Sequence, residues 1–249
     1  MPHPLHDSII PRRLVIVPAY NEVGAIGRVV RSLHANLPDY DVLVVDDGST
    51  DGTARAVPET AHVVSLPFNQ GIGGAMQTGY RFAEHYGYAV AVQVDGDGQH
   101  PADQVPKLVE VLEREGADVV VGSRFLDSRS YRPPPTRMAG IHILRLLLRV
   151  LTGRAVTDCT SGFRAAGRRA ISAFAHWYPE DYPEPEVILL LHRAGYVVRE
   201  VPIEMLPRVA GTTSIPLTSG VFYVAKVSMA LLLDMFRSPW PRGKVVPPC

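Results

Sequence analysis

Two aspartates separated by one glycine are the residues whose types and spacing most directly suggest chemistry. Asp95 and Asp97 follow the apolar run AVAVQV (89–94) and precede GQHP (98–101). Paired carboxylates are hard oxygen ligands that suit Mg²⁺ or Mn²⁺, ions that keep several waters and bridge to substrate phosphates. A solvated turn in which an aspartate caps the next helix is the competing interpretation. His100 could be a further ligand, although a position at the start of a helix explains it more simply.

A second acidic motif, DDGSTDGT (46–53), follows the apolar run VLVV (42–45). Asp46 and Asp47 can accept hydrogen bonds from a base edge or from ribose hydroxyls, as acids do in dinucleotide sites. They can equally serve the turn into the next helix, where short polar side chains bond to the backbone. Both interpretations stay open for this motif taken alone.

The glycine-rich motif NQGIGG (69–74) is not a dinucleotide-binding fingerprint. That fingerprint follows the first strand as G-x-G-x-x-G, whereas this motif follows the third apolar run and has a different spacing. Its glycines, including Gly71, allow a helix to begin close to the sheet or to the backbone of a nucleotide.

The basic candidates for phosphate binding are Arg124, Arg137, Arg164 and Arg208. An arginine beside a ligand-binding cleft can pair with a phosphate through two parallel hydrogen bonds. Any one of the four can instead be a surface residue.

The elements that must position these residues alternate regularly up to about residue 125. Buried-strand patterns cover 14–17, 42–45, 62–66, 89–94 and 118–122, and helical patterns cover 25–37, 52–57, 73–87 and 102–116. This alternation predicts an α/β fold with a mostly parallel central sheet flanked by helices on both faces. A polar cluster follows each strand, starting with PAYNE (18–22) and ending with SRF (123–125). Ligands bind beyond the carboxyl ends of such strands, so the five clusters predict one shared site.

The second half of the chain has a different character. Residues 127–137 are rich in proline and arginine and predict a loop, and 141–153 predict a helix with a stripe of Ile141, Leu144, Leu148 and Leu151. Arg145 and Arg149 lie one turn apart on that helix, where solvation is the simpler interpretation and contact with anionic lipid the alternative. The remaining patterns are an acidic segment (179–186) that enters an apolar helix, a strand within 197–206, and a last helix over about 217–237.

Composition limits the class of protein. The 249 residues are 46% hydrophobic with 25 basic and 25 acidic side chains, which fits one large α/β domain or two small ones and argues against a nucleic-acid partner. We expect a single domain over 1–249. Cys159 and Cys249 form neither a disulfide framework nor a metal-ligand spacing, so Cys159 is interpreted as a small apolar residue. The chain shows no signal-peptide pattern and no run of the ~20 apolar residues that a spanning helix needs. We therefore expect a cytoplasmic protein that is soluble or attached to a membrane only at its surface.

Taken in order, these motifs resemble those of family 2 glycosyltransferases of the GT-A fold. The resemblance covers about residues 13–236 and rests on PAYNE, VVDDGSTDGT, NQGIGGA, VDGDGQHP, GSR, TDCTSGFR and EVPIEM. TDCTSGFR with EVPI is most similar to the polyprenol-phosphate (dolichol-phosphate) mannosyltransferase-like subgroup. The resemblance implies an inverting, metal-dependent transfer of a sugar from a nucleotide-diphospho-sugar. Residues 13–125 would form the nucleotide-sugar-binding half, 126–237 the acceptor half and 238–249 a tail.

The resemblance also implies roles for individual residues. The nucleotide-sugar side would include Pro18, Tyr20, Glu22, Asp46, Asp47, Gly71, Asp95, Gln99 and Arg208. Asp97 is the implied leading ligand of Mg²⁺ or Mn²⁺, and Asp95 and Gln99 are further ligands. Arg124 would lie near the diphosphate or the acceptor phosphate, and Arg137 on the acceptor side.

The chain departs from the family pattern in three places. Gly96 and Gly98 replace the alanine and leucine of D-A-D-L-Q-H-P, which we expect to loosen this loop. The segment GTTSI (211–215) lacks the usual lysine, and the acidic segment 179–186 is not typical of the subgroup. The donor sugar and the acceptor therefore stay open.

The acceptor decides whether the reaction needs a general base. A polyprenyl phosphate is already an anion at neutral pH, whereas a sugar hydroxyl in polysaccharide or glycan assembly must lose a proton. Glu184 and Glu186 are the candidate bases, because Pro183 and Pro185 are expected to hold this segment extended toward the cleft. Structural carboxylates at the start of a helix are the alternative.

Two other classes of protein compete with a glycosyltransferase. A nucleotidyltransferase should carry a basic, glycine-rich loop after its first strand, but PAYNEVGAIG has no Lys or Arg before Arg28. A non-catalytic nucleotide-sugar-binding protein is the other class, and the retained Asp47, Asp95 and Asp97 argue against it. Further expected partners are a membrane surface or a membrane protein, through helices at about 138–152 and 217–237, or a second copy of the chain.

Overall fold

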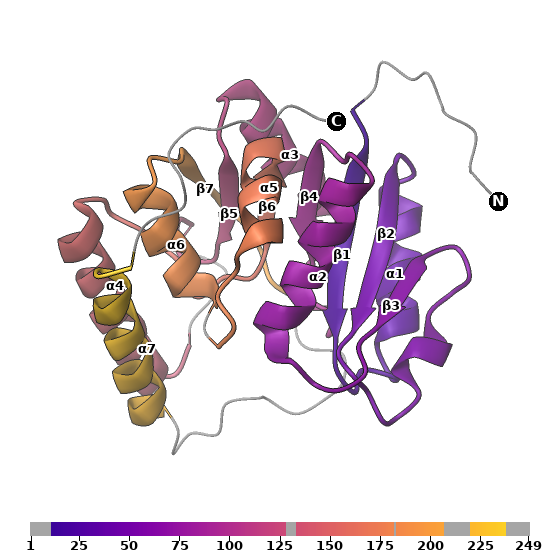
Figure 1. The fold of residues 1–249 in the computed structure, drawn as a ribbon, viewed down its shortest axis with the longest axis horizontal. Coiled ribbons are helices and arrows are strands. Elements are labelled where there is room, and N and C mark those ends of the chain that lie inside the picture. Colours follow the sequence, from indigo (N-terminus) through magenta and orange to yellow (C-terminus); the bar gives the residue numbers. More distant parts are fainter. Residues whose placement is uncertain (1–10, 128–132, 182, 207–219, 238–249) are drawn as a thin grey trace.

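The computed structural model describes residues 11–127, 133–181, 183–206 and 220–237. Within these residues, seven strands form one sheet in the order β3-β2-β1-β4-β6-β5-β7 (Figure 1). The strands are β1 (Arg13–Ala19), β2 (Tyr40–Asp46), β3 (His62–Ser65), β4 (Val90–Gln93), β5 (Val119–Ser123), β6 (Arg164–Gly167) and β7 (Val198–Pro202). β6 pairs antiparallel with β4 and β5, and the other pairs are parallel. The predicted α/β fold with a mostly parallel sheet is confirmed.

Helices cover both faces of this sheet. They are α1 (Ile26–Asn36), α2 (Gly71–His85), α3 (Val105–Arg114), α4 (Pro135–Thr152), α5 (Arg168–His176), α6 (Pro183–Arg193) and α7 (Gly220–Asp234), with 3₁₀ turns η1 (Thr53–Ala56) and η2 (Ala102–Gln104). The apolar residues of α1 and α3 share a buried cluster with one face of the strands, and those of α2, α5 and α6 share a cluster with the other. The inner strands of the sheet are therefore buried on both sides, as their β-branched residues predict, whereas the edge strand β3 is largely exposed.

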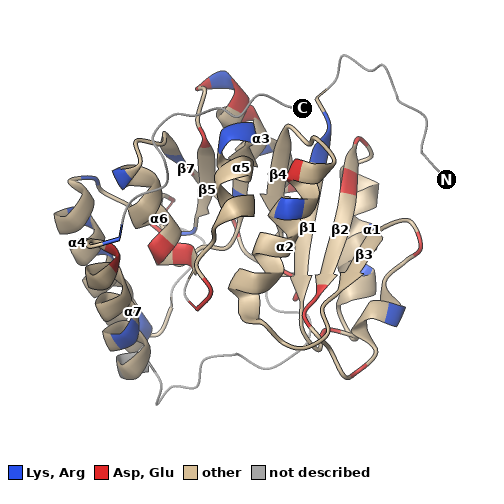
Figure 2. Cartoon of the chain, in the orientation of Figure 1, with Lys and Arg blue, Asp and Glu red and all other residues tan. Residues whose placement is uncertain are grey.

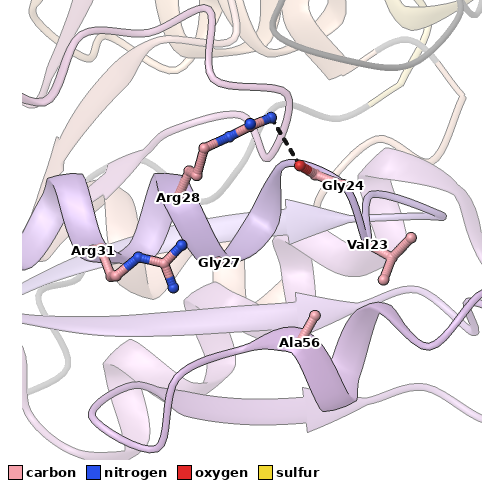
Figure 3. Close-up of a pocket in the computed structure, with 6 residues that line it drawn as sticks. All are labelled: Val23, Gly24, Gly27, Arg28, Arg31 and Ala56. Carbon is pink, nitrogen blue, oxygen red and sulfur yellow. Dashed lines mark hydrogen bonds between the residues drawn. The ribbon is translucent and has the colours of Figure 1, made fainter.

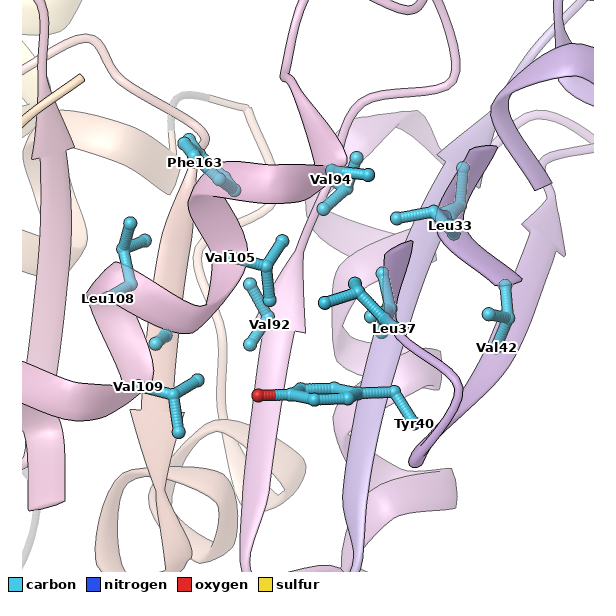
Figure 4. Packing of buried hydrophobic residues seen from close by; sticks show 14 of the residues in the cluster. Leu33, Leu37, Tyr40, Val42, Val92, Val94, Val105, Leu108, Val109 and Phe163 are labelled. Carbon is cyan, nitrogen blue, oxygen red and sulfur yellow. The ribbon is translucent and has the colours of Figure 1, made fainter. Parts of the chain in front are cut away.

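In the core beneath α3, the apolar side chains of the helix pack on those of the sheet. Val105, Leu108 and Val109 lie on one side of α3 and pack beside Val92 and Val94, in and just after β4 (Figure 4). All five side chains are buried. The apolar face made by the i, i+3, i+4 spacing of the helix thus packs on the face made by alternate residues, Val92 and Val94. This packing fixes both ends of the loop between β4 and α3.

A third layer lies outside α6. α4 and α7 pack against each other and against α6, around a cluster that includes Leu144, Leu148, Ile188, Val227 and Leu231. α6 is buried on both sides, because it separates this layer from the sheet, and its continuous apolar run reflects that position. Among the described residues, no helix combines the length and the apolar character needed to cross a membrane.

Three local predictions were wrong. Residues 127–137 are not all loop, because α4 already begins at Pro135. Residues 183–186 are not extended: α6 begins at Pro183, and proline is tolerated in the first turn of a helix, where its missing N–H has no partner to lose. Within 52–57, residues Thr53–Ala56 form a 3₁₀ turn (η1) in place of the predicted helix.

Candidate active site

The carboxyl ends of the parallel strands bring the predicted polar clusters to one edge of the sheet. Ala19 of β1 lies in register with Asp46 of β2, and the N–H of Asp47 donates to the carbonyl of Ala19 at 2.9 Å. A Cβ on Gly96 would lie 3.1 Å from the carbonyl oxygen of Pro18, so the loop after β4 lies against the end of β1. Figure 2 shows acidic residues at this lower edge, where the arrows of β1 and β2 end.

Hydrogen bonds join the loop after β1 to the loop after β2. The N–H of Asn21 donates to Ser49 Oγ at 2.9 Å, and the N–H of Thr50 donates to Asn21 Oδ1 at 3.0 Å. The N–H of Glu22 donates to Thr53 Oγ1 at 2.8 Å. Asn21 has a φ of 55°, a conformation that asparagine adopts more readily than most residues. The two loops therefore form one hydrogen-bonded unit.

Asp46 and Asp47 are both buried, with 4% and 3% of their surface exposed. Asp46 Oδ1 accepts the N–H of Ser49 at 3.2 Å, and Asp47 Oδ1 accepts the N–H of Gln70 at 2.7 Å. The next residue, Gly71, begins α2 with a φ of 81°. Both aspartates thus accept backbone N–H groups of the turns that follow, as the turn interpretation predicts, and each uses one carboxylate oxygen to do so. Because an ionised carboxylate offers about four acceptor positions, these residues keep the capacity to bind a base or ribose.

The loop after β4 is fixed by its own hydrogen bonds. Asp97 is 6% exposed, and its Oδ1 accepts the N–H of Gln99 at 2.9 Å. The N–H of Asp95 donates to Nδ1 of His100 at 3.1 Å, and this imidazole stacks on Phe163 with ring centroids 4.8 Å apart. A ring nitrogen that accepts carries no proton, so the proton is assigned to Nε2, which lies 3.7 Å from Asp95 Oδ2. His100 precedes η2 and orients Asp95, a function that sequence reasoning missed.

The donor set of this loop fits a divalent cation that takes most of its ligands from water and substrate. Across the described ranges, no three His, Cys, Asp or Glu side chains come together in a group that could hold a metal ion. The carboxylates of Asp95 and Asp97 and the amide oxygen of Gln99 are hard donors of the kind Mg²⁺ and Mn²⁺ prefer. Mg²⁺ commonly binds through one or two carboxylates plus phosphate oxygens, which matches this incomplete set.

Gly98 does not loosen the loop as expected. Its φ is 79°, a left-handed conformation that glycine adopts without steric cost and that most side chains disfavour. Glycine at this position therefore permits a tight turn between Asp97 and Gln99.

Arg124, predicted to meet a phosphate, is held by Asp158. Nε and Nη2 of Arg124 donate to the two carboxylate oxygens at 2.6 and 2.7 Å, and Nη2 also lies 2.6 Å from Thr160 Oγ1. Arg124 is 6% exposed and Asp158 is fully buried. Glu200 of β7 fixes this loop by accepting the N–H groups of Thr157 and Asp158, both at 2.9 Å. The motif TDCTSGFR was recognised in the sequence, but this partner of Arg124 within it was not.

Arg164 connects β6 to the start of α6. Its Nε donates to the carbonyl of Ser161 at 2.8 Å, and its Nη2 donates to the carbonyl of Glu184 at 2.7 Å. Only 2% of Arg164 is exposed. Next to it, a Cβ on Gly162 would lie 3.2 Å from Asp95 Oδ1. These contacts bring the TDCTSGFR loop against the carboxylate of Asp95.

The two candidate bases have different surroundings. Burial raises the pKa of Glu184, Arg164 opposes that shift and Asp95 adds to it, so the Glu184 carboxyl belongs to the charge cluster at the sheet edge. Burial and the neighbouring Asp234 raise the pKa of Glu186 to about 8. Glu186 therefore meets α7 and lies outside this cluster. The position of Glu186 does not support the prediction that this residue is a general base for a hydroxyl acceptor.

The Glu186–Asp234 contact predicts a pH-dependent stability. In the folded protein the pKa of Glu186 is about 8, against 4.5 ordinarily, so the folded state holds a proton that the unfolded chain loses between these pH values. The free energy of unfolding should therefore fall as pH rises from about 5 to about 8. Glu186→Gln should flatten this profile in urea unfolding at pH 5.5 and 8.5. Glu110→Gln, at an exposed carboxylate of α3, should leave it unchanged, and an unaltered slope in Glu186→Gln would refute the assignment.

The remaining predicted residues are spread around this edge. Tyr20 is 48% exposed and Glu22 is half-buried, beside the joined loops after β1 and β2. Arg137 is exposed in the first turn of α4. Arg208 lies outside the described residues. Cys159 is fully buried, and burial and Asp158 raise its pKa to about 12, which confirms its interpretation as an apolar packing residue.

A surface groove of about 360 Å³ lies between α1 and η1 (Figure 3). It is lined by Val23, Gly24, Gly27, Arg28, Arg31 and Ala56. Arg28 donates to the carbonyl of Gly24 at 2.8 Å and the groove contains no carboxylate, so its chemistry differs from that of the strand ends. None of the predicted site residues lines it. We therefore place the candidate active site at the strand ends.

The chain and its fold have counterparts among known proteins. The model of glycosyl transferase family 2 matches residues 14–174. Polyprenol monophosphomannose synthase of Mycolicibacterium smegmatis is 31% identical over 91% of this chain and 90% of its own length. Undecaprenyl-phosphate mannosyltransferase of Micrococcus luteus is 34% identical over 88% of this chain and 92% of its own length.

Solved structures show the same fold. Glucosyl-3-phosphoglycerate synthase from Mycobacterium tuberculosis, in complex with Mn²⁺, uridine diphosphate and glucosyl-3-phosphoglycerate, aligns with a TM-score of 0.67 at 23% identity, over 90% of this chain and 79% of that one. The similarity confirms the predicted GT-A fold. The match of the family model to residues 14–174 and the two relatives above show that the protein belongs to glycosyl transferase family 2.

Proposed function

We propose that this protein transfers a sugar from a nucleotide-diphospho-sugar to a polyprenyl phosphate, with inversion at the anomeric carbon. The observation that carries the proposal is the convergence of three acidic strand-end loops on one edge of the sheet, in a chain with relatives named for transfer to polyprenyl and undecaprenyl phosphates. The loops after β1 and β2 and the start of α2 would bind the nucleotide, through Pro18, Tyr20, Glu22, Asp46, Asp47 and Gly71.

The loop after β4 would hold the diphosphate end of the donor. Asp97, with Asp95 and Gln99, would hold Mg²⁺ or Mn²⁺, and that ion supplies positive charge to the leaving diphosphate. The N–H of Gln99, which donates to Asp97, and Nδ1 of His100, which accepts from the N–H of Asp95, fix this loop before the donor arrives, and this reduces the cost of ordering it. Arg124 adds a positive charge, and its hydrogen bonds to Asp158 hold the guanidinium group in one orientation. Arg208 is a further proposed donor contact.

The acceptor phosphate needs no general base. One of its oxygens would bond to the anomeric carbon while the bond from that carbon to the diphosphate oxygen breaks, and the nucleoside diphosphate leaves with the electron pair. No proton moves in this exchange, so neither Glu184 nor Glu186 is required as a base. Arg137, exposed in the first turn of α4, is proposed to attract the acceptor phosphate.

An acceptor comparison tests this function. The protein is incubated with GDP- and UDP-hexoses, Mn²⁺ and either undecaprenyl phosphate or the free alcohol undecaprenol, and the lipid products are measured by mass spectrometry. We expect one hexose on the phosphate and none on the alcohol. Transfer to sugar hydroxyls alone would favour glycan assembly, and binding without turnover would favour a non-catalytic protein; either result overturns the proposal.

The outer layer of α4 and α7 is proposed to lie on an anionic membrane. It exposes large apolar side chains at Ile143, Leu146, Val150, Phe222, Met229, Leu232, Leu233 and Phe236. α4 contains no Asp or Glu and the one acid of α7, Asp234, is buried, whereas Arg137 and Arg149 are exposed. Figure 2 shows these two helices together at one side of the molecule, with blue segments on both. Apolar side chains among basic ones are typical of helices that lie in the interface of anionic bilayers.

Vesicle binding tests this surface. Leu146→Gln with Val150→Gln removes two of the exposed apolar side chains and should lower flotation with phosphatidylglycerol vesicles several-fold. Val63→Gln with Val197→Gln, at exposed valines of β3 and just before β7, should leave flotation unchanged. Equal flotation of both double variants would contradict the placement of the membrane at α4 and α7.

A further inference from the structure

We propose, building on the transferase function above, that Gln93 and Gly162 position the carboxylate of Asp95 for the divalent cation. Gln93 donates a hydrogen bond to one carboxylate oxygen, and Gly162 leaves the space that both side chains occupy. Neither residue is assigned to the ion itself, so both are positioning residues. Their effect is therefore expected in the affinity of the protein for the cation.

Gln93 is a polar residue at a position that otherwise suits an apolar one. It ends β4, a strand whose four residues are all buried and which lies between β1 and β6. Only 2% of Gln93 is exposed, and a buried amide costs stability unless it is hydrogen-bonded. Its Nε2 donates to Asp95 Oδ1 at 3.4 Å. A departure from the apolar pattern that leads to a carboxylate of the proposed site is typical of a functional position.

This hydrogen bond orients Asp95 without neutralising its charge. Arg164 lies opposite Gln93 in the antiparallel register, but its Nε and Nη2 donate to the carbonyls of Ser161 and Glu184. Within the described ranges, no Lys or Arg side chain forms an ion pair with Asp95. The neutral amide of Gln93 thus holds the carboxylate and leaves its negative charge available to a cation.

The second oxygen of Asp95 faces another neutral side chain. Nε2 of His100 lies 3.7 Å from Oδ2, and Nδ1 of the same ring accepts the N–H of Asp95 at 3.1 Å. Gln93 and His100 are both buried, whereas the side chain of Asp95 is 37% exposed. The carboxylate is therefore held by buried neighbours and stays open to solvent, from which an ion with water ligands can approach.

Gly162 provides the space for this arrangement. A Cβ at this position would lie 2.8 Å from Gln93 Nε2, and 3.2 and 3.6 Å from the two carboxylate oxygens of Asp95. A side-chain carbon does not fit 2.8 Å from a nitrogen, so an alanine must displace the amide, the carboxylate or both. The φ of Gly162 is not positive, so an alanine causes no backbone strain of that kind. Gly162→Ala therefore shifts these side chains without removing a polar group.

Two control variants make the same chemical changes elsewhere. Gln93→Met keeps about the same volume and removes the donor. Gln77→Met is its match, because Gln77 of α2 is half-buried and donates from Nε2 to the carbonyl of Ala175, also at 3.4 Å. Gly167→Ala matches Gly162→Ala, because Gly167 ends β6 and a Cβ there would come no closer than 3.6 Å to the atoms around it.

Binding of Mn²⁺ measures the effect without donor or acceptor. Electron paramagnetic resonance of the free ion gives its dissociation constant for the protein, and urea unfolding checks that each variant is folded. We expect Gln93→Met and Gly162→Ala each to weaken Mn²⁺ binding about 10-fold, as is usual when a residue that orients a metal ligand is changed. Gln77→Met and Gly167→Ala should bind Mn²⁺ as the wild-type protein does. In an Asp95→Ala background, Gln93→Met should cause no further loss, because the carboxylate that it orients is missing.

Three results would overturn the proposal. The first is an unchanged Mn²⁺ affinity in Gln93→Met and Gly162→Ala, and if Gln93→Met does not fold, Gly162→Ala alone decides. The second is a further loss in the Asp95→Ala background, because Gln93 then acts through the fold and not through Asp95. The third is a wild-type protein that binds no Mn²⁺. These outcomes are distinct from failure of the proposed function, which would appear as absence of transfer to undecaprenyl phosphate by a wild-type protein that binds Mn²⁺.

Discussion

Asp97→Asn is expected to lower the rate of sugar transfer about a thousandfold, because it removes charge from the position that would hold the divalent cation at the leaving diphosphate. The protein should stay folded. Asparagine keeps an Oδ1 that can accept the N–H of Gln99, which Asp97 now bonds at 2.9 Å. Asp95→Asn should cause a smaller loss, since Asp95 is the more exposed, supporting carboxylate.

The measurement is the initial rate of nucleoside diphosphate release with undecaprenyl phosphate, alongside circular dichroism and urea unfolding. Asp103→Asn is the control, because Asp103 is an exposed aspartate in η2, a few residues further along. It should keep the rate of the wild-type protein. Near-normal transfer by a folded Asp97→Asn protein would refute the assignment of the cation site.

Asp158→Asn is expected to destabilise the fold by about 3–5 kcal/mol, because it leaves the buried guanidinium of Arg124 without its counter-charge. The pair is bidentate at 2.6 and 2.7 Å, and both side chains are almost completely buried. Removal of both partners, Arg124→Met with Asp158→Leu, should restore much of the lost stability, because no buried charge then lacks a partner. The single variant should also transfer sugar more slowly, since Arg124 loses its fixed direction.

Urea unfolding provides the test, with an exposed pair as the reference. Arg114 and Glu110 form an ion pair at 2.9 Å on α3, with side chains that are 60% and 68% exposed. Glu110→Gln should change the free energy of unfolding by less than about 1 kcal/mol. A loss of the same size for Asp158→Asn would show that the buried pair contributes no more than a surface pair.

The sequence predicted the sheet well because its signal is local and repeated. Buried parallel strands are continuous apolar runs, and β1, β2 and β4 begin or end within a few residues of the predicted limits. The convergence of the polar loops followed from parallel pairing alone. β6 was missed as a strand: it spans only Arg164–Gly167, and its antiparallel place between β4 and β5 depends on contacts far apart in the chain.

The charged partners in the site were harder to predict for the same reason. Arg124 and Asp158 are 34 residues apart, and nothing in their local sequence indicates that the carboxylate satisfies the arginine. The ring of His100, which accepts the N–H of Asp95, also stacks on Phe163, a residue far along the chain. The prediction of an extended segment at Pro183 and Pro185 is wrong because the first turn of a helix accepts proline, and both residues lie in the first turn of α6.

A crystal structure of the complex with a nucleoside diphosphate and Mn²⁺ is the most direct test of the proposed location of the active site. We predict the base and ribose at Asp46 and Asp47, beyond β2, and the metal at Asp97, beyond β4. The groove between α1 and η1, lined in part by Arg28 and Arg31, is the alternative location for an anion. Density for the nucleotide in that groove, with the aspartates of β2 and β4 empty, would contradict the assignment of the active site to the strand ends.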